Sequence, residues 1–255
     1  MFVITIDQEG STGDVDRVPE LLETLAAAAP APVLAFERTA GDEVQGLLAD
    51  AAATLAVVRA ALRLGRWQIG VGVGSVVTPL PASTRAASGE VFVRARDAVE
   101  RAKSRRMAVP VAVTGGLAVG GAPHDAAPPH APGSNVAGPS ATEPRAAERD
   151  TGPRLAAADA EALLQLLGTV VERRTEPGWE AVDTLLGVDA EIQGTPRGVG
   201  TAARRAGVER RSRSQAAGML GVSEQALSKR LRTAAWQQER AVLPTLVRVL
   251  EEVDR

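Results

Sequence analysis

The chain has 255 residues, a net charge of −2 and 45% hydrophobic residues, enough for compact domains whose cores are aliphatic, since only 2% of residues are aromatic. It contains no cysteine, which excludes disulfides, cysteine nucleophiles and Cys-ligated metal centres and fits a reducing, cytoplasmic location. No apolar run approaches the ~20 residues of a membrane-spanning helix, and the N-terminus turns acidic too early for a secretory signal, so no membrane partner is expected.

The first 113 residues alternate between patterns typical of strands and of helices. Short apolar runs predict strands at 2–6, 32–37, 44–48, 67–77 and 109–113. Apolar residues at helical spacing predict helices that include Val18, Leu55 and Val99. The order β-α-β-β-α-β, followed by a further helix and strand, indicates an α+β protein in which residues 1–119 form a ferredoxin-like or palm-type domain.

Three glycines share one face of the predicted strand at 67–77, because Gly70, Gly72 and Gly74 occupy every second position. They lie within a strand and not at a strand-to-helix turn, so they do not form a dinucleotide-binding fingerprint. Glycines thin this face of the sheet, which leaves room for a ligand or for a closely packed helix.

The second half of the chain changes character. Residues 120–153 are rich in Gly, Ala, Pro and Ser without a periodic apolar pattern, which predicts a flexible linker. Residues 154–255 carry helical patterns and are expected to form an all-helical domain, interrupted at 188–200 by glycines and a proline.

A helix-turn-helix is predicted at residues 214–232. Ala217 is small enough for two helices to cross closely, and Gly221 can supply the positive φ that ends the first helix. Ser223 is a good N-cap for the second helix. The small core between the helices would be filled by Leu220, Val222, Leu227 and Leu231.

The segment around this motif is basic. Residues 201–240 hold nine Arg or Lys and three Glu, a net +6 in a chain whose total is −2. Such a segment is typical of a phosphate-binding module, although arginines can also form a plain solvated surface. The residues expected to contact double-stranded DNA are Ser223, Glu224, Gln225, Ser228, Lys229 and Arg232 on the second helix, with Arg211 and Arg213 ahead of the first.

DNA readers of this kind usually work as dimers on two half-sites, so a homodimer is expected. The last predicted helix carries Leu243, Leu246, Leu250 and Val253 on one face. This face would supply the dimer seam or pack onto the helix-turn-helix core.

Three segments together resemble the SatD family. They are Ile4-Thr-Ile-Asp7, the hairpin Phe36-Glu-Arg-Thr-Ala-Gly-Asp-Glu-Val-Gln-Gly46, and Gln225-Ala-Leu-Ser-Lys-Arg-Leu231. The resemblance covers most of the chain except the linker and residues 188–200. Members are bacterial proteins, some linked to stress or acid tolerance, so the resemblance implies little about mechanism.

The first domain also resembles the palm domains of class III nucleotide cyclases and GGDEF diguanylate cyclases. Asp7 after the first strand and Asp42 at the hairpin match acids that hold a divalent metal on a nucleotide triphosphate in those enzymes, and Glu43 matches the next acid of GGDEF. The resemblance therefore implies Mg²⁺ with a nucleotide effector. The later helix offers Arg94 and Arg96 but no Asn, so the catalytic set is incomplete.

Three functions remain open from the sequence. The first is a DNA-binding transcriptional regulator whose palm-like domain senses a nucleotide or metal. The second is a metal-dependent nucleotidyl cyclase-like enzyme tethered to DNA, and the third is an interaction scaffold. Alternatively, Asp7 and Asp42 only stabilise the turns in which they lie and bind no ligand.

Overall fold

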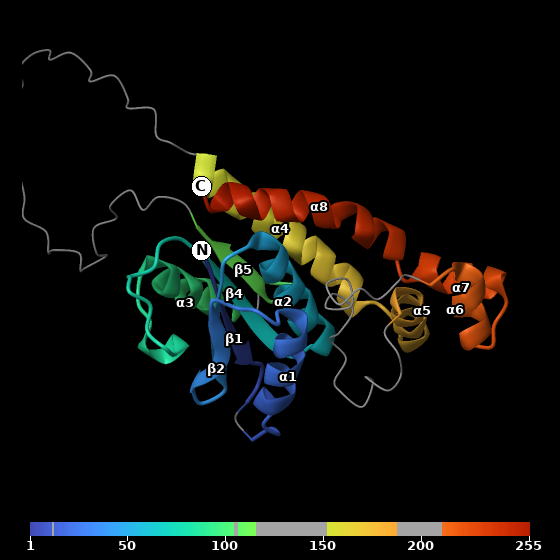
Figure 1. Ribbon diagram of the computed structural model, residues 1–255, viewed down its shortest axis with the longest axis horizontal. Coiled ribbons are helices and arrows are strands. Elements are labelled where there is room, and N and C mark those ends of the chain that lie inside the picture. The colour runs from blue at the N-terminus through green and yellow to red at the C-terminus, as the bar shows by residue number, and fades with distance from the viewer. Residues whose placement is uncertain (12, 105–106, 116–151, 188–210) are drawn as a thin grey trace, which may run out of the picture.

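A five-stranded mixed sheet is the centre of the α+β fold in a computed structural model that describes residues 1–11, 13–104, 107–115, 152–187 and 211–255 (Figure 1). Its strands are β1 (Phe2–Gln8), β2 (Leu34–Ala40), β3 (Glu43–Leu48), β4 (Trp67–Val73) and β5 (Val111–Thr114). They lie in the order β2-β3-β1-β4-β5, and only β4 and β5 are parallel neighbours. The α+β class is confirmed, and the fourth strand ends at Val73 where the sequence predicted residue 77.

Eight α-helices and one 3₁₀ helix accompany the sheet in the described part of the chain. They are α1 (Val18–Ala28), α2 (Ala51–Leu64), η1 (Thr84–Ala86), α3 (Glu90–Ala102), α4 (Gly152–Glu172), α5 (Glu176–Leu186), α6 (Arg213–Met219), α7 (Glu224–Thr233) and α8 (Trp236–Val253). None of these helices combines the length and hydropathy needed to cross a membrane. Most of the predicted linker and the predicted interruption at 188–200 lie outside the described residues.

Alternating side chains of β1 enter two different cores. Phe2, Ile4 and Ile6 are buried with α1 and α2 on one face of the sheet. Val3 is buried on the other face with Val91 of α3. Figure 1 shows the same division, with α1 and α2 on one side of the sheet and α3 on the other.

The glycines of β4 bring α3 unusually close to the sheet. A Cβ at Gly70 would lie 2.3 Å from the backbone nitrogen of Val99, and a Cβ at Gly72 would lie 2.3 Å from the carbonyl oxygen of Val91. Both partners are backbone atoms of α3, so they cannot turn away as a side chain could. Of the two uses considered for this face, the close helix is therefore the one observed.

Helices α4 and α8 lie side by side and complete the core on the α1–α2 face of the sheet (Figure 1). Leu164 of α4 and Leu246 and Leu250 of α8 are fully buried in the same cluster as Phe2 and Ile4. The apolar face of the last helix thus packs against α4 and the sheet unit, and the expectation that it forms a dimer seam or covers the helix-turn-helix core is wrong for these leucines. The two chain ends also meet, because the Met1 ammonium pairs with Asp254.

Side chains close the free edge of β5. The backbone N–H of Val113 donates to a carboxylate oxygen of Glu161 at 2.8 Å, and the Gln165 amide donates to the carbonyl of Val111 at 3.1 Å. Arg101 donates to the carbonyl of Val113 at 2.7 Å. An edge strand with satisfied backbone groups no longer offers a template for another strand.

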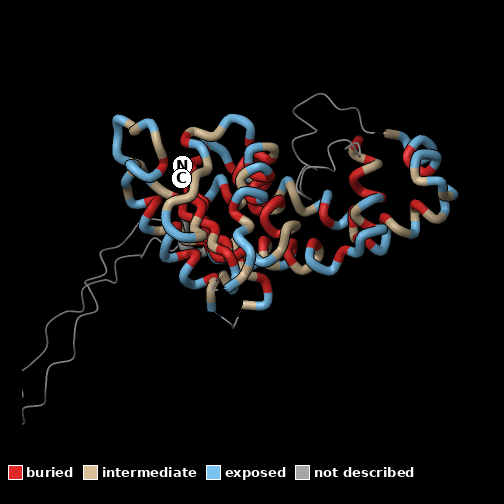
Figure 2. Tube along the Cα trace, turned by 90° about the horizontal axis from the view of Figure 1, so that it is seen from below, coloured by how far each residue is buried: buried red, intermediate tan, exposed pale blue. Residues whose placement is uncertain are grey.

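A second, smaller core holds α5, α6 and α7 together at the far end of the molecule from the chain termini (Figures 1 and 2). It contains Ala181, Val182, Leu185, Ala216, Ala217, Leu227, Leu231, Ala234 and Trp236. Ala234 at the end of α7 and Trp236 at the start of α8 both belong to this cluster. Helix α8 therefore begins at the small core and runs back along the large one.

A buried charged junction, formed by Arg59, Arg63, Arg174, Asp183 and Glu239, joins the two cores. The Glu239 carboxylate accepts from both Arg59 and Arg174, and the side chains of Glu239 and Arg174 are fully inaccessible to solvent. Arg63 makes a two-bond ion pair with Asp183 of α5. The ring centroid of Trp179 lies 4.0 Å from the guanidinium carbon of Arg63 and 4.3 Å from that of Arg174. The junction therefore links α2, the loop between α4 and α5, α5 itself and α8.

Candidate functional site

Four residues shape the start of α6 and the tight turn that joins it to α7. Ser212 accepts from the backbone N–H of Gln215 and forms a capping box at the start of α6. Gly221 takes a φ of 62° just after α6, which a residue with a side chain rarely adopts. Ser223 accepts from the N–H of Ala226 at 3.1 Å and begins α7. The glycine and the Ser223 cap are as the sequence predicted.

The interior of this helix pair also matches the prediction. Ala217, Leu227 and Leu231 are buried, and Leu220 and Val222 pack against them. These residues meet Ala181 and Leu185 of α5, which the sequence did not associate with the motif. α5 therefore acts as a third helix that supports the other two.

The predicted DNA-contacting residues of α7 lie on its outer side. Glu224, Gln225, Lys229 and Arg232 are exposed, and Ser228 is half-buried. Because Leu227 and Leu231 point into the core, the polar residues occupy the opposite face of an amphipathic helix. Ser223 is exposed too, although its hydroxyl serves as the cap.

The two predicted arginines ahead of α6 differ. Arg213 is exposed at the first turn of α6. Arg211 is half-buried, and its guanidinium donates to the carbonyl of Thr184 at 3.2 Å. Its backbone N–H donates to Leu185, so Arg211 ties the chain to the end of α5. Arg230, which the sequence analysis passed over, pairs with Glu180 of α5 at 3.3 Å.

The three predicted acids of the first domain lie at one end of β1 and β3. Asp42 accepts from the backbone N–H of Gln8 at 3.2 Å, and Glu43 accepts from the Thr39 hydroxyl at 2.5 Å. Asp7 is half-buried, and this burial is the main cause that raises its pKa, to which the charges of Asp42 and Glu43 add. Within the described part of the chain, no three acids or histidines are arranged to hold a metal ion together.

Lys103, directly after α3, is the residue of this region that the sequence analysis missed. Its ammonium lies 3.2 Å from Asp7 and 2.8 Å from Glu100. Burial raises the pKa of Asp7, and Lys103 opposes that rise without cancelling it. Burial alone would lower the pKa of Lys103, but its hydrogen bonds to Glu100 and Asp7 outweigh burial and raise it. The positive charge beside Asp7 is thus supplied by the protein itself.

Replacing Lys103 with methionine is expected to raise the pKa of Asp7 further, because the only influences left on that carboxyl are burial and neighbouring acids. A carboxyl whose folded pKa exceeds the unfolded value of 3.8 favours folding at low pH and loses that contribution as pH rises through the folded pKa. The substitution therefore shifts the loss of this stabilising contribution to higher pH. The pKa would be read from the carboxyl ¹³C shift of Asp7.

Lys229→Met is the matched control for this titration, since Lys229 is exposed on α7 and should leave the Asp7 curve unchanged. An Asp7 carboxyl that titrates at or below 3.8 in the unaltered protein, or that ignores the loss of Lys103, contradicts the arrangement.

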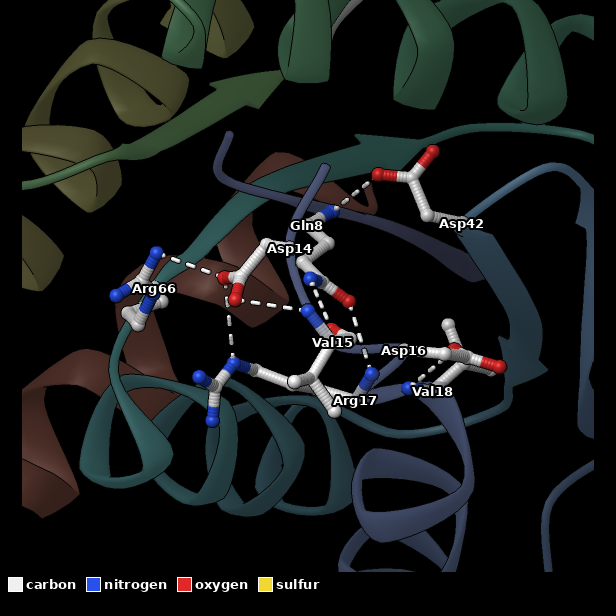
Figure 3. Close-up of polar contacts among 8 residues, drawn as sticks. All are labelled: Gln8, Asp14, Val15, Asp16, Arg17, Val18, Asp42 and Arg66. Carbon is white, nitrogen blue, oxygen red and sulfur yellow. Dashed lines mark hydrogen bonds and ion pairs between the residues drawn. The ribbon is translucent and has the colours of Figure 1, made fainter. Parts of the chain in front are cut away.

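The loop between β1 and α1 is organised by one buried side chain (Figure 3). The Gln8 amide donates to the carbonyl of Val15 at 2.8 Å and accepts from the N–H of Arg17 at 3.0 Å. Asp14 then pairs with Arg66 at 2.8 Å and with Arg17 at 3.6 Å. The loop is therefore held by its own polar contacts next to Asp42.

Compared with known proteins, the chain matches no family model, no curated protein and no solved structure. The resemblance to the SatD family consequently stays a prediction.

Proposed function

We propose that the protein is a DNA-binding regulator and that the α6–turn–α7 pair is its helix-turn-helix. The observation that carries this proposal is the outer face of α7, where Gln225, Lys229 and Arg232 are exposed on a helix whose other face is anchored by Leu227 and Leu231. A rigid helix with free polar and basic side chains is what major-groove recognition needs.

The roles of the side chains follow from their chemistry. Gln225, in the first turn of α7, can pair with both edge groups of an adenine. Lys229 and Arg232 reach guanine or phosphate, while Arg213 at the start of α6 is free to contact the backbone of the duplex. Arg211 is removed from this set, because its guanidinium is engaged with Thr184.

Two substitutions separate these roles. Lys229→Ala is expected to weaken binding to every sequence and to reduce the salt dependence of the affinity, since one phosphate-neutralising charge is lost. Gln225→Ala is expected to relax the preference at one base pair, by about 1–3 kcal/mol of discrimination. Both are measured by fluorescence anisotropy with duplexes selected from genomic fragments, at several salt concentrations.

Arg248→Ala is the control for this experiment, because Arg248 is an exposed arginine on α8 far from the reading helix. Equal losses of affinity from Arg248→Ala and Lys229→Ala would show that DNA binding is a general effect of positive charge. Unchanged titrations for both Lys229→Ala and Gln225→Ala would show that α7 is not the recognition helix.

We further propose a ferredoxin-like or palm-type fold for the first domain. Its support is the strand order, in which β1 lies between β3 and β4 and β2 pairs with β3, as in the split βαβ arrangement.

Asp7, Asp42 and Glu43 fit a magnesium site poorly, because Lys103 already balances Asp7 and the three acids do not converge. No catalytic step is therefore derived for the enzyme alternative, and a nucleotide effector at this end of the sheet remains a proposal tested by ligand titration.

A further inference from the structure

Helix α4 presents a short apolar stripe on the side opposite its buried face. Leu164 and Leu167 are buried in the large core. Leu166 points away from them and is 66% exposed, the second most exposed large hydrophobic side chain in the described part of the chain. Ala162 is exposed beside it, and Val170 is half-buried one turn further on. Because most of this leucine side chain lies in solvent, it contributes little to the fold of a single chain.

Two charged residues flank the stripe symmetrically. Asp159 precedes Leu166 by seven residues and Arg173 follows it by seven, directly after the end of α4. Seven residues are two helical turns, or about 10 Å, so all three side chains lie along one line on the helix. Both charged residues are exposed, and neither forms an ion pair within the described ranges.

We propose that this stripe is a homodimer interface in which α4 packs antiparallel against α4 of a second copy, with the two-fold axis at Leu166. In such an arrangement each residue opposes the one equally far on the other side of the axis. Asp159 of each copy then faces Arg173 of the other, which gives two ion pairs. Ala162 faces Val170 in the same way, and Leu166 meets its own counterpart. A small residue opposite a larger one lets the two helices approach.

The occupant is a second copy because the pattern is complementary to itself. An interface with a different protein would not require opposite charges at equal distances from a central leucine. The interface also leaves α6 and α7 uncovered, since they lie beyond the end of α4 (Figure 1).

The geometry has a further implication that rests on the proposed function. Helices α6 and α7 follow the C-terminal end of α4, so antiparallel pairing places the α6–α7 pairs of the two copies at opposite ends of the joined helices. With the axis at Leu166, α4 runs only six residues further to Glu172, or about 9 Å, so the two C-terminal ends lie about 18 Å apart along the joined helices. The two α6–α7 pairs lie beyond these ends (Figure 1) and are separated by more than this, as two half-sites on DNA require.

Crosslinking through an introduced cysteine tests the axis directly, because the chain has no cysteine of its own. The full-length Leu166→Cys protein is expected to form a disulfide-linked dimer under mild oxidation, since each thiol meets its own copy. Val93→Cys is the matched control, because Val93 is a 57% exposed apolar residue on α3. Crosslinking that is equally fast at both positions, or absent at Leu166→Cys, overturns the proposal.

A charge exchange tests the register. Asp159→Arg and Arg173→Asp alone each place like charges opposite one another and are expected to weaken dimerisation at least tenfold in sedimentation equilibrium. The double variant restores both opposite pairs with the same net charge and is expected to return to within about threefold of the unaltered protein. A monomeric unaltered protein, or a double variant no better than the singles, contradicts the interface. No DNA is present in either assay, so failure here is distinct from failure of DNA binding.

Discussion

Replacing Glu239 with alanine is expected to lower the free energy of unfolding by about 3–5 kcal/mol, the largest single effect that the structure implies. The loss arises because Glu239 is the shared partner of Arg59 and Arg174, and its side chain has no exposure to solvent. Without it, Arg174 keeps a hydrogen bond to the carbonyl of Ala234 and its contact with the Trp179 ring, but it remains charged inside the protein with no carboxylate beside it. Urea unfolding followed by tryptophan fluorescence would measure the change, since Trp179 lies against the same guanidinium group.

Glu252→Ala provides the comparison, because Glu252 is an exposed acid on the same helix and its loss should change stability by less than about 0.5 kcal/mol. If Glu239→Ala and Glu252→Ala unfold at the same urea concentration, the junction contributes no net stability. A double replacement of Glu239 and Arg174 by methionine should cost less than Glu239→Ala, since no charge is then left unpaired at Arg174.

Gly72→Ala is expected to destabilise the protein by about 1–3 kcal/mol or more, although alanine normally favours folding over glycine. The added methyl would stand 2.3 Å from the carbonyl oxygen of Val91 and 2.4 Å from the backbone nitrogen of Ala95. Helix α3 must then move away from β4 along its length, which opens contacts on both sides. Thermal unfolding of the variant would report the loss.

Gly218→Ala is the matched control for the same chemical change. Nothing lies within 4 Å of a Cβ at Gly218, and the residue is inside α6. Alanine there should leave the protein equally stable or stabilise it by up to about 1 kcal/mol. An unfolding temperature at Gly72→Ala that equals or exceeds that of Gly218→Ala would mean that α3 is not held as closely as described.

The local features were predictable from the sequence, because each depends on neighbours in the chain. Gly221 and Ser223 specify a turn and a cap through their own backbone and hydroxyl preferences. Leu227 and Leu231 reveal the buried side of α7 through helical spacing alone. The five strands were similarly visible as apolar runs between turn residues, but the second was placed at 32–37 instead of Leu34–Ala40 and the fourth was extended four residues beyond Val73.

The features that need long-range pairing were not predictable. Lys103 and Asp7 are 96 positions apart, and the local sequence around either residue does not predict their contact. The junction joins Arg59 to Glu239 across 180 positions. The periodic leucines of α8 showed which side is buried but not against what, because an apolar face is compatible with any apolar partner. Hence the packing of α8 on the sheet unit could not be distinguished from a dimer seam.

The place of α8 in the core of the sheet unit has a consequence for biosynthesis. Leu246, Leu250 and Val253 fill the same core as Phe2 and Ile4, so residues more than 240 positions later in the chain complete this core. Domains ordinarily fold from the N-terminus as they emerge. Here the nascent sheet must wait, with part of its apolar surface uncovered, until α8 has left the ribosome. Loss of α8, as after a premature stop ahead of it, would therefore damage the first half of the protein as much as the second.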